Sequence, residues 1–327
     1  MTHDHWPALD EEAWLLVAGI ASVLVIASLL GCLLKITVAR RATHATIDNA
    51  ISRINSWWVI AIVVGFALLC GRSGVTLLFA LVSLAALREF VAAGIPNMPD
   101  VPGSYPRAII PGTVLLIVPL QYLLVWKGSY LLFTALIPCL VWVVLPILGG
   151  LLSARIPGLQ SRMHTLQAGL LICVFSISHI PALLTLQIDG HPERNGYLLI
   201  YLLLVVQASD VLQYLWGRLA GRHLITPGLS PSKTVEGTVG GIVTATVLGA
   251  GLSSLTPFTI VEGTLISLLI TLLGFASGLA MSAVKRRRGI KDWGSLIPGH
   301  GGILDRIDSL FLPAPAFYYL LRYGWAN

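Results

Sequence analysis

Long apolar segments follow one another along almost the whole chain. This feature restricts the possible fold classes more than any other feature of the sequence. A helix that crosses the hydrocarbon layer of a membrane needs about 20 mostly apolar residues. Windows that satisfy this requirement lie at residues 14–34, 108–126, 129–149, 164–186, 196–217, 236–254 and 259–284. The polar segments between them are too short to form a separate water-soluble domain. The sequence therefore predicts one all-α, polytopic integral membrane protein.

Two further apolar stretches are less regular. Residues 57–87 are interrupted at "CGRSG", so they predict either two short spans or one bent insertion, and residues 309–323 are short and contain prolines. We count about ten spans, with nine as the main alternative. Only 11% of the residues are charged, whereas a soluble domain carries about 25%. The polar residues 38–56 are expected to form a short helix on the membrane surface.

The distribution of basic residues predicts the orientation, because Lys and Arg favour the cytoplasmic loops of membrane proteins. With ten spans and the N-terminus outside, all 21 Lys and Arg residues fall on the cytoplasmic side except Arg72, Lys127, Arg194 and Arg322. This asymmetry favours the ten-span map and, in a bacterium, predicts the cytoplasmic (inner) membrane as the location. It also places the two segments that contain the candidate polar and charged site residues, 207–236 and 282–308, on the cytoplasmic side.

Two aspartates near the C-terminus are candidate metal ligands. Asp305 and Asp308 are three residues apart, so on a helix they share one face and can converge on a single hard cation. A carboxylate at a membrane boundary is costly unless it is paired, hydrogen-bonded or bound to metal. Taken alone, the pair is more typical of a solvated helix start, where acidic side chains favour the N-terminus.

The residues before this pair add features that suit phosphate binding. Gly301 and Gly302 in "PGHGG" allow backbone conformations in which successive N–H groups hold an anion. Lys285, Arg286 and Lys291 are cations that suit phosphate oxygens, although "KRRR" is also typical of a topology anchor. In combination with the two aspartates, these residues predict a site for a nucleoside triphosphate.

A second polar segment also contains an acidic residue, a cation and hydroxyl groups that suit a phosphate site. Asp210 lies inside an apolar span, where an ionisable residue indicates a functional site; the alternative is a buried carboxylate whose hydrogen bonds are satisfied. The next helix has an N-terminus that favours anions, and hydroxyl groups and a cation precede it: Ser230, Ser232, Lys233 and Thr234. Gly237 and Gly241 have the spacing of closely packed helices, and we expect packing from them rather than ligand binding.

Residues 282–308, "SAVKRRRGIKDWGSLIPGHGGILDRID", resemble the full signature of the phosphatidate cytidylyltransferases, which are also called CDP-diacylglycerol synthases. The segment "SPSKTVEGTVGG" at 230–241 resembles the second recurring block of that family. Because the signature covers 27 residues, a chance match is very improbable. The similarity runs from about residue 57 to the C-terminus and leaves residues 1–56, a span and a basic loop, as an extension.

The resemblance implies an all-α polytopic enzyme that condenses CTP with phosphatidic acid in the membrane, giving CDP-diacylglycerol and pyrophosphate. It implies Mg²⁺ as the cofactor, and it leaves open a second, monovalent cation such as K⁺ and a homodimer. Asp305, Asp308 and Asp210 would bind the metal, and Lys233 and Lys285 would complete the catalytic set. The residues expected to contact the substrates are Ser230, Ser232, Thr234, Ser282, Arg286, Lys291, His300, Gly301, Gly302 and Arg306.

Two positions depart from the family pattern. Gly278 stands where members commonly have an aspartate in a Gly-Asp-Leu segment, so a carboxylate of the metal site is missing here. The sequence "SDVLQY" at 209–214 replaces a version with small residues, although Asp210 is kept. These departures indicate a divergent subgroup, and they leave the lipid acceptor and the set of ions open.

Two other functions are alternatives. A lipid kinase that uses CTP would transfer the γ-phosphoryl group to a lipid hydroxyl and release CDP. A transporter or a non-catalytic protein on the same fold would explain the intramembrane Asp210 and the missing carboxylate. The chain has no GxxxxGK[ST] motif, which disfavours ATP-driven transport. Its basic residues are dispersed over membrane-edge loops, which argues against nucleic acid as a partner.

Overall fold

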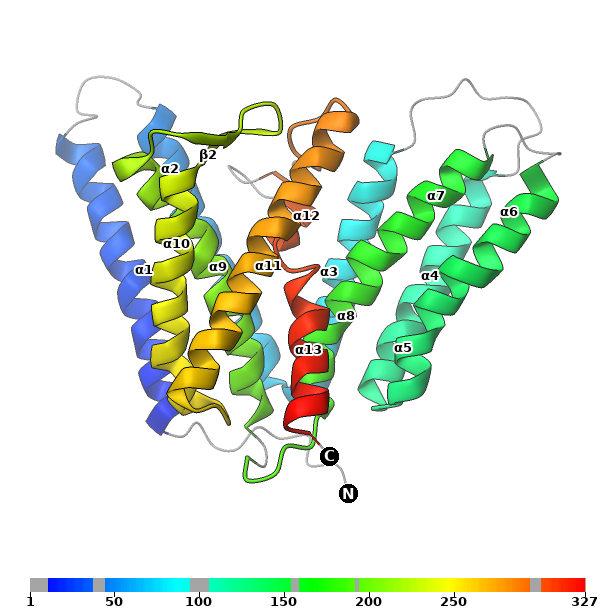
Figure 1. Cartoon of the computed structure of the whole chain (residues 1–327), viewed down its shortest axis with the longest axis horizontal. Helices are drawn as coiled ribbons and strands as arrows, with labels where there is room; N and C mark the ends of the chain where they lie inside the picture. Colours follow the sequence, from blue (N-terminus) through cyan, green and yellow to red (C-terminus); the bar gives the residue numbers. More distant parts are fainter. Residues whose placement is uncertain are drawn as a thin grey trace.

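A computed structural model of the chain describes residues 11–37, 45–94, 106–153, 159–191, 194–294 and 301–326. Long helices run side by side between the two ends of the molecule (Figure 1). The paired strands β1 (Leu224–Thr226) and β2 (Ser230–Thr234) lie at one of these ends, and the short helix α12 (Leu304–Ile307) lies within the bundle nearer to that end than to the other. We call this end of the bundle the site end.

The first four helices are α1 (Glu11–Thr37), α2 (Ala45–Leu69), α3 (Gly71–Gly94) and α4 (Pro106–Trp126). Two composite spans follow, in which α-helical turns continue into π-helical or 3-10 turns. The first consists of α5 (Tyr130–Cys139), η1 (Leu140–Val144) and α6 (Leu145–Ser153). The second consists of α7 (Leu159–Gly169), η2 (Leu170–Ser176), α8 (Ile177–Ala182) and η3 (Leu183–Thr185). The remaining helices are α9 (Asn195–Ala220), α10 (Val235–Gly251), η4 (Leu252–Leu255), α11 (Ile260–Arg287) and α13 (Pro313–Gly324).

Over the described residues, eight helical segments are long and apolar enough to cross a membrane. They are α1, α2, α3, the two composite spans, α9, α10 with η4, and α11. This result confirms the predicted all-α polytopic membrane protein. α4 is 21 residues long and mostly apolar in sequence, whereas α13 has 12 residues and is shorter than a full span. The ten-span map stays a prediction, because it depends on counting these two segments as spans.

The irregular stretch 57–87 forms two helices. α2 ends at Leu69 and α3 begins at Gly71, whose φ of +68° is a conformation that glycine adopts without strain. Both helices have the length of a full span, because α2 already begins at Ala45. Residues 45–56 therefore continue directly into the membrane-spanning helix, so the expectation of a separate surface helix was wrong for them. Residues 38–44 lie outside the described part of the chain.

The prolines near the C-terminus start α13 rather than break it. Pro313 occupies the first helical turn, where the backbone N–H groups have no partner within the helix. Pro315 also lies within this turn, so neither proline removes an intrahelical hydrogen bond. The helix then buries Phe317, Tyr318 and Leu321 against the rest of the bundle.

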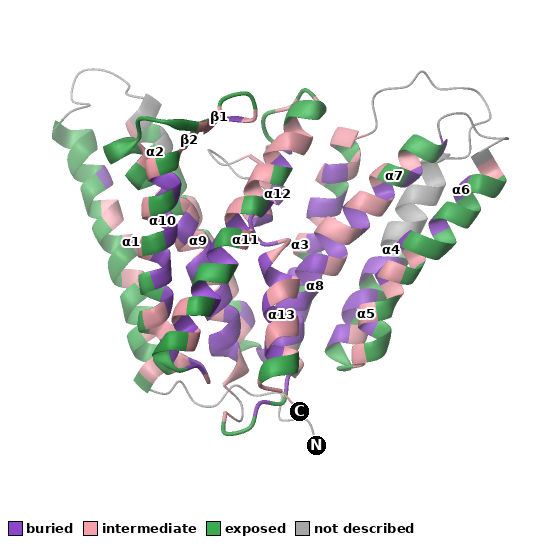
Figure 2. Cartoon of the chain, viewed as in Figure 1, coloured by how far each residue is buried: buried purple, intermediate pink, exposed green. Residues whose placement is uncertain are grey.

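The pattern of burial is that of a helix bundle in lipid. Among its described side chains, α1 buries only Ala13 and Gly31, and its other apolar side chains are mostly exposed (Figure 2). In contrast, α8 is buried along its whole length. An apolar surface as extensive as that of α1 is rare on a water-soluble protein and suits a helix that faces lipid. The chain is therefore an integral membrane protein.

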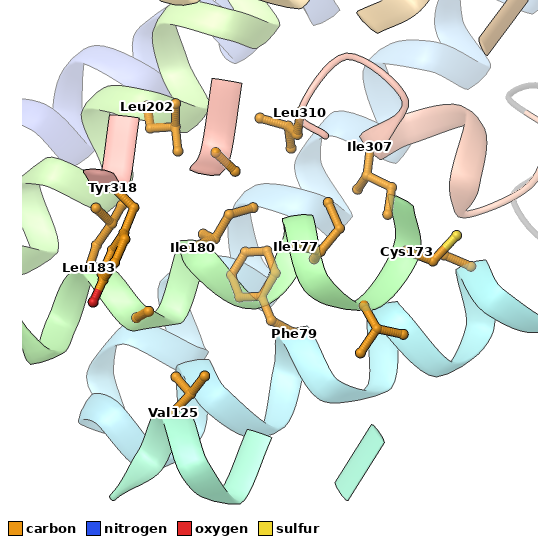
Figure 3. Close-up of a cluster of buried hydrophobic side chains, with 14 of the residues drawn as sticks. Phe79, Val125, Cys173, Ile177, Ile180, Leu183, Leu202, Ile307, Leu310 and Tyr318 are labelled. Atoms are coloured by element: carbon orange, nitrogen blue, oxygen red, sulfur yellow. The ribbon is translucent and has the colours of Figure 1, made fainter. Parts of the chain in front are cut away.

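The buried core extends to the C-terminal end of α12. Figure 3 shows Ile177 and Ile180 of α8 between Phe79 of α3 on one side and Ile307 and Leu310 on the other. Ile307 is the last residue of α12, and Leu310 follows it in the connection to α13. Both side chains are buried in this cluster. The core thus anchors the segment that carries Asp305 and Asp308.

Close packing of α10 on α9 fixes the position of the preceding strand, β2. A Cβ atom on Gly241 would lie 2.5 Å from the backbone N of Gln213, and one on Gly237 would lie 2.7 Å from Cα of Gly217. Both contacts are too short for any other residue, so these glycines let the two backbones approach. The predicted packing role of Gly237 and Gly241 is confirmed.

Candidate active site

Lys285 joins the two aspartates of α12 to α11. Its Nζ donates to Oδ1 of Asp305 at 3.0 Å and to Oδ2 of Asp308 at 3.2 Å. The three side chains are largely buried, with exposed fractions of 13%, 5% and 18%. Burial raises the pKa of Asp308 to about 6, and the ammonium of Lys285 opposes that rise. As the spacing predicts, both carboxylates lie on one side of α12, where they share Lys285 as a partner.

Asp305 also organises the backbone around it. Its second oxygen, Oδ2, accepts hydrogen bonds from the N–H of Trp293 at 2.8 Å and from the N–H of Gly302 at 2.9 Å. Gly301 has a φ of +85°, and a Cβ there would lie 2.7 Å from Oδ2 of Asp305. Glycine at position 301 is therefore needed for both reasons. The N–H of Gly302, expected to hold a phosphate, here donates to the carboxylate of Asp305.

Lys233 and Asp210 approach the same cluster from β2 and α9. The electrostatic neighbours of Lys233 are Asp210, Asp308 and Lys285, and its Nζ lies 4.8 Å from the ring centroid of Phe275. Burial lowers the pKa of Lys233. Asp210 is close to Lys233, Arg306 and Ser309. The candidate site therefore brings together three carboxylates and three cations from four elements: Asp210, Asp305, Asp308, Lys233, Lys285 and Arg306.

Arg306 interacts electrostatically with the three aspartates of the site. Its guanidinium has Asp308, Asp305 and Asp210 as neighbours, and burial lowers its pKa. Its backbone carbonyl accepts a hydrogen bond from Nε2 of Gln207 at 3.1 Å, which ties α12 to α9. Arg306 thus belongs to the cluster, and its contact with the substrates stays a prediction.

Other predicted substrate contacts have structural partners of their own. The Oγ1 of Thr234 accepts from the N–H of Gly237 and caps α10. Ser282 donates to the carbonyl of Gly278 within α11 at 2.7 Å. Arg286 donates from Nε to the carbonyl of Leu229 at 3.2 Å and so holds the β1–β2 hairpin against α11.

The remaining predicted residues differ in exposure. Ser230 is buried, whereas Ser232 and Lys291 are exposed. Gly302 is buried beside Asp305. His300 lies outside the described residues. The exposed positions leave Ser232 and Lys291 open to a soluble ligand at the site end.

One carboxylate that the sequence interpretation missed also reaches this region. Glu89 of α3 accepts hydrogen bonds from the N–H groups of Ile303 and Leu304, at the start of α12. A signal was present in the sequence, because Glu89 is the only acidic residue of α3 and an ionisable side chain in an apolar helix is costly without a partner. Its partners are backbone amides more than 200 residues away, which no local pattern identifies.

The carboxylates do not form a complete metal site by themselves. Within the part of the chain that the structure describes, no three His, Cys, Asp or Glu side chains converge closely enough to hold a metal ion. Mg²⁺, however, is commonly bound by one or two protein carboxylates, with water and substrate phosphates as its other ligands. The arrangement of the site therefore suits a cation that is completed by a bound phosphate.

Comparison with known proteins covers the whole of this region. A family model described as "Cytidylyltransferase family" matches residues 51–324. The uncharacterized protein YnbB of Escherichia coli strain K12 is 35% identical over 272 residues, which are 83% of this chain and 87% of that protein. The phosphatidate cytidylyltransferase of Staphylococcus aureus strain COL is 27% identical over 266 residues, 80% of this chain and 96% of the relative. That of Staphylococcus saprophyticus is 36% identical over 151 residues, 46% of this chain and 58% of the relative.

Proposed function

This chain belongs to the cytidylyltransferase family, and from that premise we propose that it transfers the cytidylyl group of CTP to phosphatidic acid, giving CDP-diacylglycerol and pyrophosphate. The relatives named phosphatidate cytidylyltransferase support this acceptor. One observation carries the proposal: Lys233, Lys285, Asp305 and Asp308 converge at one end of a membrane-spanning bundle. A site in this place can take one substrate from water and the other from the bilayer.

The reaction needs alignment and charge neutralisation more than it needs a base. An oxygen of the lipid phosphate attacks the α-phosphorus of CTP, and the new P–O bond forms as the bond to the β-phosphate oxygen breaks. The electron pair of that bond leaves with pyrophosphate. Because the attacking phosphate is already an anion, no proton has to be removed from it. The protein's task is to hold the two phosphates in line and to balance their negative charge.

The cations of the site suit that task. Lys285 is held between Asp305 and Asp308, so in the absence of substrate its charge is balanced by the protein. When the triphosphate enters, we expect Lys285 to exchange one carboxylate for a phosphate oxygen. Lys233 and Arg306 both interact electrostatically with Asp308, so their charges act on the same region of the site. These cations would stabilise the charge on the leaving pyrophosphate.

Asp308 and Asp210 fit the role of Mg²⁺ ligands. Asp308 uses Oδ2 for Lys285, and within the described part of the chain its Oδ1 accepts no hydrogen bond. Asp210 lies nearby and is the third carboxylate of the cluster. Both oxygens of Asp305 are engaged, so we assign to Asp305 the task of holding the surrounding backbone. When bound, Mg²⁺ would polarise the α-phosphate and neutralise the leaving group.

The proposal also assigns a side of the membrane to the site. Its substrates and the distribution of Lys and Arg both favour the cytoplasmic face. In a bacterium, the protein would then lie in the inner membrane with its N-terminus outside.

Incubation of the purified protein in detergent with Mg²⁺, phosphatidic acid and CTP labelled at the α-phosphate tests the proposal. We expect label to enter the lipid fraction and pyrophosphate to appear in equal amount. CDP without labelled lipid would instead identify a CTP-dependent lipid kinase. If several phospholipid acceptors give no product while a control cytidylyltransferase is active, the proposed function is wrong.

A further inference from the structure

Glu89 holds the start of α12 from a different helix. Its Oε1 accepts a hydrogen bond from the N–H of Ile303 at 3.0 Å, and its Oε2 accepts one from the N–H of Leu304 at 2.9 Å. The first N–H groups of a helix have no partner within the helix, and a carboxylate also suits the positive end of the helix dipole. Glu89 thus does what a capping side chain normally does from within its own helix.

Two carboxylates share three consecutive amides at this point. The N–H of Gly302 donates to Asp305, and the N–H groups of Ile303 and Leu304 donate to Glu89. Asp305 in turn accepts from Lys285. A continuous set of hydrogen bonds therefore connects Glu89 through the backbone of 302–304 to the candidate catalytic residues.

Two glycines make room for the Glu89 carboxylate. The three atoms closest to a Cβ on Gly302 would all belong to the carboxyl group of Glu89, with Oε1 at 2.7 Å. A Cβ on Gly294 would lie 2.8 Å from the same Oε1. The structure describes no positive φ at either glycine. The absence of a side chain at 294 and 302 is therefore explained by the space that Glu89 occupies.

The residue next to Glu89 holds the segment between α11 and α12. The ring of Phe90 stacks on that of Trp293, with centroids 5.1 Å apart. The carbonyl of Phe90 accepts from Nη1 of Arg288 at 2.7 Å, and the guanidinium of Arg288 lies over the Phe90 ring. The end of α3 therefore contacts the polypeptide both where it leaves α11 and where it enters α12.

A four-residue helix does not hold its own direction. α12 consists of Leu304–Ile307 only, and a single helical turn is unstable by itself because nucleation fixes several residues for one hydrogen bond. Its orientation must come from contacts with other parts of the protein. Ile307 and Leu310 fix one end in the core, and Glu89 fixes the other.

We propose that Glu89 is a positioning residue for cytidylyl transfer: by binding the amides of Ile303 and Leu304 it directs Asp305 and Asp308 toward Lys285. The kinetic part of this inference rests on the proposed function. The structural part does not, because the hydrogen bonds of Glu89 can be tested in the absence of substrates.

The first experiment compares Glu89→Gln and Glu89→Ala with a matched control in the full-length protein. Glu262→Gln is a suitable control, because Glu262 also accepts a backbone N–H at a helix start, that of Thr259 at 2.8 Å. It lies about 35 Å along α11 from Lys285. We expect both Glu89 variants to lower kcat by about 10²-fold with little change in KM for CTP. Glu262→Gln should leave both constants unchanged. A rise in KM alone, or equal losses in the control, would overturn the proposal.

A double-mutant cycle tests the contact itself. Gly302→Ala places a methyl group against the Glu89 carboxylate, and we expect it alone to lower kcat by a similar factor. In the Glu89→Ala background this collision is absent, so Gly302→Ala should cost little more. Effects that multiply across the cycle would show that the two positions act independently and would contradict the inference.

Hydrogen exchange separates this inference from the proposed function. In the wild-type protein, the amides of Ile303 and Leu304 should exchange slowly, and Glu89→Ala should accelerate exchange in a peptide that covers 302–307. This readout requires no turnover. If the wild-type protein transfers no cytidylyl group but Glu89→Ala accelerates exchange, the proposed function fails and the structural role of Glu89 stands. Unchanged exchange would remove that role even in an active enzyme.

Discussion

The Nζ of Lys233 lies 3.4 Å from the point that a Cβ of Gly278 would occupy. The two residues come from β2 and α11, and the space between them is not filled by a side chain of residue 278. Family members resembled by this chain commonly have an aspartate at the corresponding position. Lys233 therefore lies beside a position that has no side chain, and the carboxylates that act on it are Asp210 and Asp308.

Gly278→Asp should strengthen the use of Mg²⁺. The new carboxylate would project toward Lys233 and add a third acidic group to the Asp210 and Asp308 pair, and the affinity of a hard cation rises with the number of charged ligands. We expect the Mg²⁺ concentration for half-maximal activity to fall about tenfold, which corresponds to about 1.4 kcal/mol. Gly278→Asn is the matched control, because it has the same shape without the charge. Equal curves for both variants would contradict the assignment of the metal.

Lys285→Met should cost both activity and stability. The substitution leaves Asp305 and Asp308 largely buried without their shared cation, and removal of one partner of a buried ion pair typically costs about 3–5 kcal/mol. We expect a lower midpoint of thermal unfolding in detergent and no measurable turnover. Lys285→Arg keeps the charge and should retain most of the stability. A Met variant as stable as wild type would show that the two aspartates do not need this cation.

Asp305→Asn and Asp308→Asn should differ from each other. An amide group in place of an oxygen of Asp305 faces either Lys285 or the N–H groups of Trp293 and Gly302, so a donor meets a donor. Each buried group left without a partner costs about 1–3 kcal/mol, and Asp305→Asn should therefore lower both stability and turnover. Asp308→Asn should lower turnover by at least about 10²-fold and leave the unfolding midpoint near that of wild type. Equal losses of stability in the two variants would refute this division of roles.

The sequence alone predicts most of what local spacing determines. The separation of Asp305 and Asp308 by three residues predicted that the two carboxylates share a face, and in the structure both accept hydrogen bonds from Lys285. Their binding of a metal ion stays a prediction. The spacing of Gly237 and Gly241 predicted close helix packing, which the contacts with α9 confirm. In each case, the prediction rests on the spacing of residues along one helix, which determines whether they lie on the same face.

The parts that the sequence did not predict depend on long-range contacts or on single backbone torsions. Glu89 accepts hydrogen bonds from the backbone N–H groups of Ile303 and Leu304. Because almost every residue has such an N–H group, the sequence does not indicate which of them Glu89 binds. The division of 57–87 into two helices depends on one positive φ at Gly71, which many glycines of the chain do not adopt. The hydrogen bond from the N–H of Gly302 to Asp305 was also not predictable, because a glycine-rich loop allows several arrangements of its N–H groups.

Two glycines of α10 offer a direct test of the packing that positions β2. Gly241→Ala would push a Cβ to 2.5 Å from the backbone N of Gln213, whereas an added Cβ on Gly251 meets no heavy atom within 4 Å. Overpacking of this kind costs about 1–3 kcal/mol, and displacement of α10 would also move Lys233, which lies two residues before it. We expect Gly241→Ala to lower the unfolding midpoint and the turnover together. Gly251→Ala should be neutral or slightly stabilising, because alanine reduces the freedom of the unfolded chain. Since both substitutions add the same methyl group to the same helix, equal midpoints would mean that α9 and α10 can separate freely and that Lys233 is not held by their contact.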